Sequence, residues 1–157
     1  MARRPIRRAR GGTYDIRLPP EVRALLKSLA GQLLVLLEDP AADPGLVRLS
    51  PVAYPDDPER EAEYRAMVGD ELLEGRRRTA RILEATADAT TLEEEELEAW
   101  MRAVNDVRLV LGTKLDVSED DDLDALALDD QDPEAAAYAL YHYLGHLLEQ
   151  IVVELRL

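Results

Sequence analysis

The sequence of 157 residues contains no cysteine. This absence excludes disulfide bonds, thiolate metal ligands, a cysteine nucleophile and a thiol-based redox switch. The chain also has no phenylalanine and only one tryptophan, and no apolar run approaches the ~20 residues of a membrane span. The arginine-rich start is not followed by the apolar segment of a secretory signal. We therefore expect a cytoplasmic protein that does not enter a membrane.

Leucine and acidic residues dominate what is present. The chain has 27 leucines, 46% hydrophobic residues and a formal net charge of −14. A core of leucine and alanine with few rings is typical of helices packed on helices. The predicted fold class is therefore all-α, as a single bundle-like domain of four to five helices. The net charge argues against direct nucleic-acid binding, which needs a basic face to displace counterions.

Charge is distributed unevenly along the chain. Residues 1–12 hold five arginines and no acid, and we expect them to form a flexible basic tail before a single helical domain over 13–157. Residues 116–132 hold nine acids and no lysine or arginine, which predicts a solvated acidic loop. Such a loop suits a protein partner with a basic surface. The alternation in Thr13 to Leu18 is compatible with one short N-terminal strand, but too few partner strands are recognisable for a sheet.

Apolar periodicity and helix-start signals place the helices. We expect them over 21–38, 59–87 with a break near Gly75, 92–115 and 133–157. Thr91 and Glu94 have the spacing of a capping box for the third helix. Asp132-Pro133 has the pattern of an N-cap followed by proline for the last one. The second stretch carries a basic cluster of four arginines: Arg76, Arg77, Arg78 and Arg81.

The segment from Trp100 to Leu115 is the most informative. Arg108 falls in the middle of its apolar face, so we expect Arg108 to be buried and paired with a carboxylate or with backbone carbonyls. Two interpretations stay open: an arginine that links two helices, or a groove that recognises a protein partner. The candidate partner-binding residues are Trp100, Asn105, Asp106, Arg108 and Gly112.

The two histidines of the chain suggest a metal-dependent enzyme as a third possibility. His142 and His146 lie four residues apart, and Glu149 follows, which is a possible zinc pattern. However, these residues lie on the polar side of the last helix, which favours two solvent-exposed histidines. The sequence has no GxGxxG, GxxxxGK[ST] or GxSxG motif. We therefore predict no catalytic residue, no metal and no cofactor.

Three segments resemble a known family. ALLKSLAGQLLVLLED (24–39), PVAYPDDPEREAEYR (51–65) and above all WMRAVNDVRLVLGTKL (100–115) are similar to the actinobacterial oxidative-stress regulators of the AosR type, first catalogued as a domain of unknown function. The excess of 17 arginines over 2 lysines suits an actinobacterial source. The resemblance implies an all-helical, non-enzymatic transcriptional regulator that binds an alternative sigma factor during oxidative stress.

The resemblance also leaves alternatives. Members of the family are often encoded near a Clp-protease adaptor, which suggests an accessory or adaptor role in Clp-type proteolysis. In the best-known member of the family a pair of cysteines forms a disulfide in response to oxidants; this chain has no cysteine, so that switch cannot operate here. The sequence does not determine the partner, the triggering signal, whether the arginines touch nucleic acid, or the oligomeric state, a homodimer included.

Overall fold

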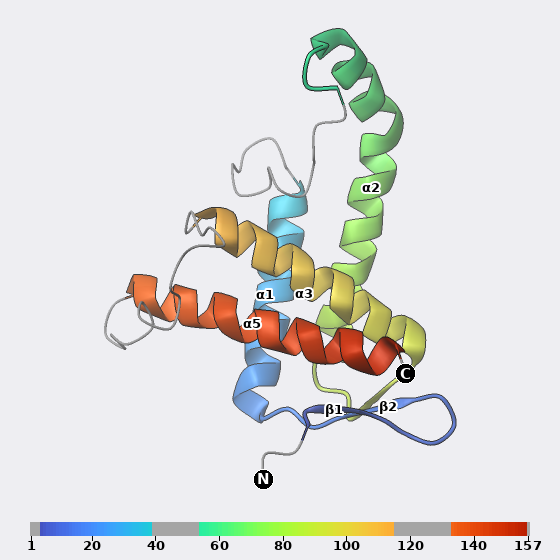
Figure 1. Cartoon of the computed structure of the whole chain (residues 1–157), viewed down its shortest axis with the longest axis vertical. Helices are drawn as coiled ribbons and strands as arrows, with labels where there is room; N and C mark the ends of the chain where they lie inside the picture. The colour runs from blue at the N-terminus through green and yellow to red at the C-terminus, as the bar shows by residue number, and fades with distance from the viewer. Residues whose placement is uncertain (1–3, 39–53, 115–132, 157) are drawn as a thin grey trace.

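The computed structural model describes residues 4–38, 54–114 and 133–156 (Figure 1). The acidic segment 116–132 lies outside them. Four long helices and a small sheet make up this part of the chain, in the order β1 (Ile6–Arg8), β2 (Tyr14–Ile16), α1 (Pro20–Glu38), α2 (Pro58–Thr86), β3 (Thr91–Leu92), α3 (Glu94–Lys114) and α5 (Pro133–Arg156). The helices pack in chain order, α1 on α2, α2 on α3 and α3 on α5. The prediction of a mainly helical protein is thus confirmed.

None of the helices in these three stretches combines the length and the hydropathy that a membrane span requires. The apolar sides of the helices form one main core, and Tyr138 and Tyr141 of α5 form a small second cluster with Leu111. Trp100 is fully buried in the main core, and its indole Nε1 donates a hydrogen bond of 2.6 Å to Thr86 Oγ1. Through this hydrogen bond the buried Trp100 side chain joins α3 to the end of α2.

Proline and carboxylates set the helix starts. Asp57 is the N-cap of α2, where its side chain accepts a bond of 3.2 Å from the Arg60 N–H, and Pro58 follows at the first helical position. In α3 the capping box is formed by Glu93 and Glu96, whose Oε1 accepts from the Glu93 N–H at 2.8 Å. The predicted Thr91–Glu94 box is wrong because Thr91 belongs to β3, so the helix begins later.

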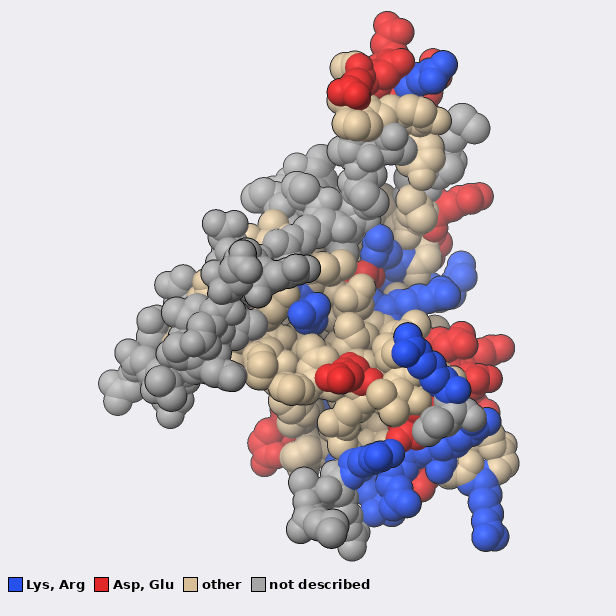
Figure 2. Space-filling model, in the orientation of Figure 1, with Lys and Arg blue, Asp and Glu red and all other residues tan. Residues whose placement is uncertain are grey.

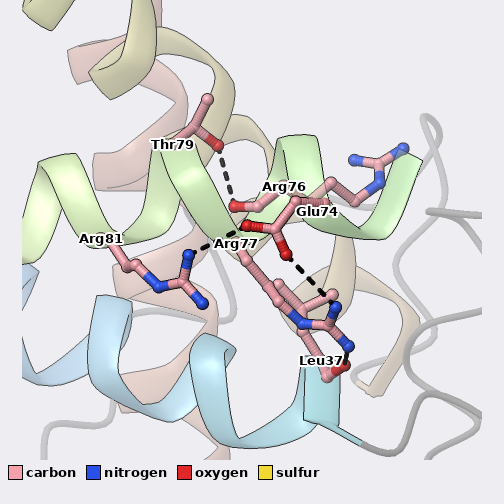
Figure 3. Close-up of polar contacts among 6 residues, drawn as sticks. All are labelled: Leu37, Glu74, Arg76, Arg77, Thr79 and Arg81. Carbon is pink, nitrogen blue, oxygen red and sulfur yellow. Dashed lines mark hydrogen bonds and ion pairs between the residues drawn. The ribbon is translucent and has the colours of Figure 1, made fainter. Parts of the chain in front are cut away.

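The predicted break near Gly75 does not form. Helix α2 runs without interruption from Pro58 to Thr86, because packing against α1 and α3 outweighs the low helix propensity of glycine. Figure 3 shows how the middle of α2 is held to the end of α1. Arg77 Nη2 donates to the Leu37 carbonyl at 2.7 Å, and Glu74 lies within 3.6 Å of Arg77 and 3.1 Å of Arg81.

A three-stranded antiparallel sheet closes one end of the helical body. Its strand order is β1-β2-β3, with Ile6 opposite Ile16 and Tyr14 opposite Leu92. These four side chains are at most 2% exposed and join the helical core. The hairpin turn contains Gly11 and Gly12 at φ +85° and +82°, a backbone conformation that glycine adopts without strain.

This sheet corrects two expectations. The strand near Thr13 is not alone, and residues 1–12 are not a flexible tail throughout, because Ile6–Arg8 forms β1 with Ile6 completely buried. β1 has three residues and β3 has two, which is too short for a recognisable alternating pattern, so neither strand could be predicted from the sequence.

Candidate functional site

A groove with a volume of about 770 Å³ lies between α2 and α3. We call it the α2–α3 groove. Its lining from α2 is Glu71, Leu72, Gly75, Arg76, Arg78, Thr79 and Ile82, and its lining from α3 is Glu95, Glu98, Ala99, Arg102, Asn105 and Asp106. Within each helix the lining residues recur about every three to four positions, so they lie on one face of that helix.

The groove has an apolar strip between charged borders. Leu72 is 51% exposed and Ile82 is half-buried, so both offer apolar surface to the groove, whereas Ala99 is buried in its wall. The exposed border residues carry both charges, with Glu95 and Glu98 near the start of α3 and Arg102 one turn later. An apolar strip with flanking charges is the usual receptor for an amphipathic helix.

A buried ion pair forms part of the groove wall. Arg76 Nη1 lies 2.5 Å from Asp106 Oδ1, and the side chains are 26% and 6% exposed. Burial raises the pKa of the Asp106 carboxyl, and the neighbouring Arg76 opposes that rise without cancelling it. The Arg76 guanidinium points away from the contact with α1 (Figure 3), so the arginines of the basic cluster make contacts on two sides of α2.

The five predicted partner-binding residues do not share one surface. Asn105 and Asp106 line the α2–α3 groove, Asp106 as part of its ion pair. Trp100 is completely buried and Gly112 is buried too, so both belong to the interior. Arg108 contacts α5 instead of lining the groove. Sequence reasoning missed Arg76, whose contact with Asp106 spans 30 residues and leaves no spacing signal.

Arg108 is the clearest correction to the sequence analysis. Its guanidinium lies over the Tyr141 ring, 4.5 Å from the centroid, and it is half-buried. Its Nε is buried without a hydrogen-bond partner, and no carboxylate or carbonyl of the described residues pairs with it. Gly145 leaves it room, since a Cβ there would lie 3.2 Å from Arg108 Nε. Within the described residues, the Arg108 guanidinium is thus held by a cation–π contact with α5 and not by an ion pair.

The structure does not assemble the possible zinc pattern of His142, His146 and Glu149. His142 and His146 are exposed on α5, and their Nε2 atoms lie 2.9 Å apart. Within the described stretches, no group of three or more histidine, aspartate or glutamate side chains is placed to hold a metal ion, so Glu149 does not join the pair.

Comparisons with known proteins agree on one family. Residues 3–155 match the model of a family described as "Domain of unknown function (DUF2017)". A protein of Mycobacterium tuberculosis named "Oxidative stress regulator AosR" is 29% identical over 184 residues, which cover 92% of this chain and 83% of that protein. The Mycobacterium bovis protein of the same name matches with the same identity and coverage. No solved structure matches the chain at a significant level.

Proposed function

The chain belongs to the DUF2017 family, and from that premise we propose that it is a cytoplasmic regulatory protein, not an enzyme, that binds a component of the transcription machinery. The partner we propose is an alternative sigma factor, and the setting is the response to oxidative stress. The observation that supports this most is the likeness, along 92% of the chain, to proteins named as oxidative stress regulators. The α2–α3 groove is the surface that we assign to the partner.

The groove favours a helical segment of the partner. The groove runs between two helices and has apolar residues between charged ones, so it can take the nonpolar side of an amphipathic helix while polar residues of that helix meet the borders. Glu95 and Glu98 would face basic residues of that helix, whereas Arg102 and Arg78 would face acidic ones. Because opposite charges follow each other along α3, they fix the direction in which the partner helix lies.

Arg102→Glu is expected to weaken binding of a purified alternative sigma factor from the same organism by about tenfold, since a close charge contact at an interface becomes repulsive. Arg102 is exposed, so its substitution should leave the fold intact. Isothermal titration calorimetry measures the Kd. Lys27→Glu is the matched control, because Lys27 lies on α1, is 57% exposed and undergoes the same charge change.

Three outcomes would contradict the proposed interface. The first is that no alternative sigma factor of the organism binds the wild-type chain. The second is that Arg102→Glu binds as tightly as the wild type, which would move the interface elsewhere. The third is an equal loss in Lys27→Glu, which would indicate an effect of net charge and not of the groove.

Binding should also be independent of thiol oxidants. The chain has no cysteine, so treatment with diamide followed by desalting has no thiol to oxidise. We expect the Kd of the diamide-treated chain for an untreated, reduced partner to equal that of the dithiothreitol-treated chain within twofold. A tenfold difference between the two preparations would show that this chain senses oxidants by another group.

A further inference from the structure

The arginines near the N-terminus are held on an ordered scaffold. We call residues 4–17 the arginine hairpin; it contains β1, the glycine turn and β2, and its exposed arginines are Arg4, Arg7, Arg8, Arg10 and Arg17. The buried Ile6, Tyr14 and Ile16 hold it to the helical body. Figure 2 shows Lys and Arg gathered at the end of the molecule where Figure 1 draws this hairpin.

Among the described contacts, Arg4 is the hairpin arginine whose side-chain charge helps to hold the hairpin to α5. The buried carboxylate of Glu154 on α5 accepts from the Arg8 backbone N–H at 3.3 Å and from Arg4 Nη1 at 3.5 Å. Among the described residues, no carboxylate pairs with the guanidinium groups of Arg7, Arg8, Arg10 or Arg17, whereas Arg60, Arg76, Arg77 and Arg81 all have acidic partners. Among the described residues, Arg78, Arg102 and Arg156 also lack a carboxylate partner, but they lie on three different helices, whereas the four hairpin arginines lie within one short hairpin.

The strand register fixes where these charges point. Arg7 is opposite Asp15, and Arg17 lies two residues beyond Asp15, so Arg7 and Arg17 share the outer face of the arginine hairpin. Ile6, Tyr14 and Ile16 occupy the inner face against the helices. Arg10 is exposed in the turn that connects the strands. The outer face of the hairpin therefore carries Arg7 and Arg17 beside the Asp15 carboxylate, and Arg10 lies at its tip.

We propose that the arginine hairpin binds the phosphate backbone of duplex DNA. A guanidinium matches the oxygens of a phosphate in a bidentate arrangement. The arginines are exposed on a hairpin whose strand β1 is an edge strand of the three-stranded sheet, so they can reach a phosphate backbone. A protein partner is disfavoured because an interface centre needs apolar anchors. None of the exposed large hydrophobic residues of the described chain, Leu25, Val35, Tyr54, Tyr64, Leu72, Tyr143 and Val153, lies on the hairpin.

The proposal refines the conclusion drawn from net charge. A charge of −14 opposes DNA over the surface as a whole, but it does not describe a hairpin with unpaired arginines at one end. Repulsion from the remaining acids confines the contact to this end, so binding should be weak, independent of base sequence and sensitive to salt. It is independent of the proposed sigma-factor contact, which uses α2 and α3.

The test is fluorescence anisotropy with a labelled 20-base-pair duplex of arbitrary sequence. Nonspecific binding by four arginines predicts a Kd in the range of about 10⁻⁶ to 10⁻⁴ M at 50 mM salt and a log–log salt slope between about −3 and −4. Affinity should fall by about 100-fold between 50 and 200 mM salt. The triple variant Arg7→Gln, Arg10→Gln, Arg17→Gln should bind at least tenfold more weakly, with a slope near −1.

The matched control removes three positive charges elsewhere. Lys27→Gln, Arg60→Gln and Arg81→Gln together change side chains that are 57%, 70% and 58% exposed and that pair with acids. This variant should bind DNA within threefold of the wild type. The proposal is overturned if the wild type does not bind at 50 mM salt, if the control loses as much affinity as the hairpin variant, or if polyglutamate displaces the duplex at equal charge concentration. Circular dichroism melts verify that both variants are folded.

Discussion

Arg23→Ala is expected to lower the free energy of unfolding by about 3 kcal/mol, because Arg23 makes four hydrogen bonds to carbonyl oxygens and each bond from a charged donor stabilises by about 1.5–3 kcal/mol without strict additivity. Arg23 Nε donates to Leu18 at 3.0 Å and Nη2 to Ile16 at 2.9 Å. Nη1 donates to Ala87 at 3.0 Å and to Ala89 at 2.6 Å. One guanidinium therefore joins the end of β2 to the turn that connects α2 with β3.

The arrangement of the four carbonyl oxygens suits the Arg23 guanidinium and no other side chain. The four acceptors surround a planar fork, and a lysine ammonium has only three donors at one point. We expect Arg23→Lys to recover less than half of the loss. The exposed turn residue Arg10 is the control, and Arg10→Ala should change the free energy of unfolding by less than about 0.5 kcal/mol.

Urea unfolding followed by circular dichroism measures both variants. A loss of about 3 kcal/mol corresponds to a fall in Tm of about 10 °C for a domain of this size. The assignment fails if Arg23→Ala is within 1 kcal/mol of the wild type, or if Arg23→Lys is fully stable. In the second case the positive charge, and not the fork of donors, would be the stabilising feature.

The long helices could be predicted from sequence because each carries several turns of apolar periodicity. The expected 21–38 helix begins within one residue of α1 (Pro20–Glu38), and the expected start at Pro133 matches α5. The sheet could not be predicted, because a strand such as β3, with two residues, has no period to detect. Its register depends on burial of Ile6 and Ile16 against helices that come later in the chain.

The contacts of single residues in the candidate site could likewise be predicted only in part from the sequence. The sequence placed Arg108 on the core side of α3 correctly, but a helical wheel does not reveal that the neighbour on α5 is the Tyr141 ring. Asn105 and Asp106 were predicted as contact residues from their position beside Arg108, and both line the groove. Arg76 was visible only as one of a basic cluster, since its pairing with Asp106 depends on how α2 packs against α3.

Arg76→Ala is expected to destabilise the protein by about 3 kcal/mol at pH 7.5, because removal of one partner of a buried ion pair leaves the other charge without compensation. Asp106 is 4% exposed and cannot regain full hydration when Arg76 is lost. Arg78→Ala provides the control, since Arg78 lines the same groove but is exposed and should tolerate truncation within about 0.5 kcal/mol.

The loss should depend on pH in a defined direction. Burial already raises the pKa of Asp106 above its ordinary value of 3.8, and loss of Arg76 removes the influence that opposes this rise. A carboxyl with a raised pKa binds more protons in the folded than in the unfolded protein, so stability falls as pH increases through the window between the unfolded and folded pKa. Arg76→Ala should therefore lose less stability, relative to the wild type, at pH 5 than at pH 7.5.

A double variant separates the charge from the packing. In Arg76→Ala, Asp106→Asn the buried group is neutral, so most of the stability lost in Arg76→Ala should return and the extra pH dependence should disappear. Urea unfolding at pH 5 and pH 7.5 of the wild type, both single variants and the double variant gives the complete cycle. If Arg76→Ala loses the same stability at both pH values, or the double variant is no more stable than Arg76→Ala, then Arg76 stabilises the groove wall by the packing of its side chain and not by compensating the Asp106 charge.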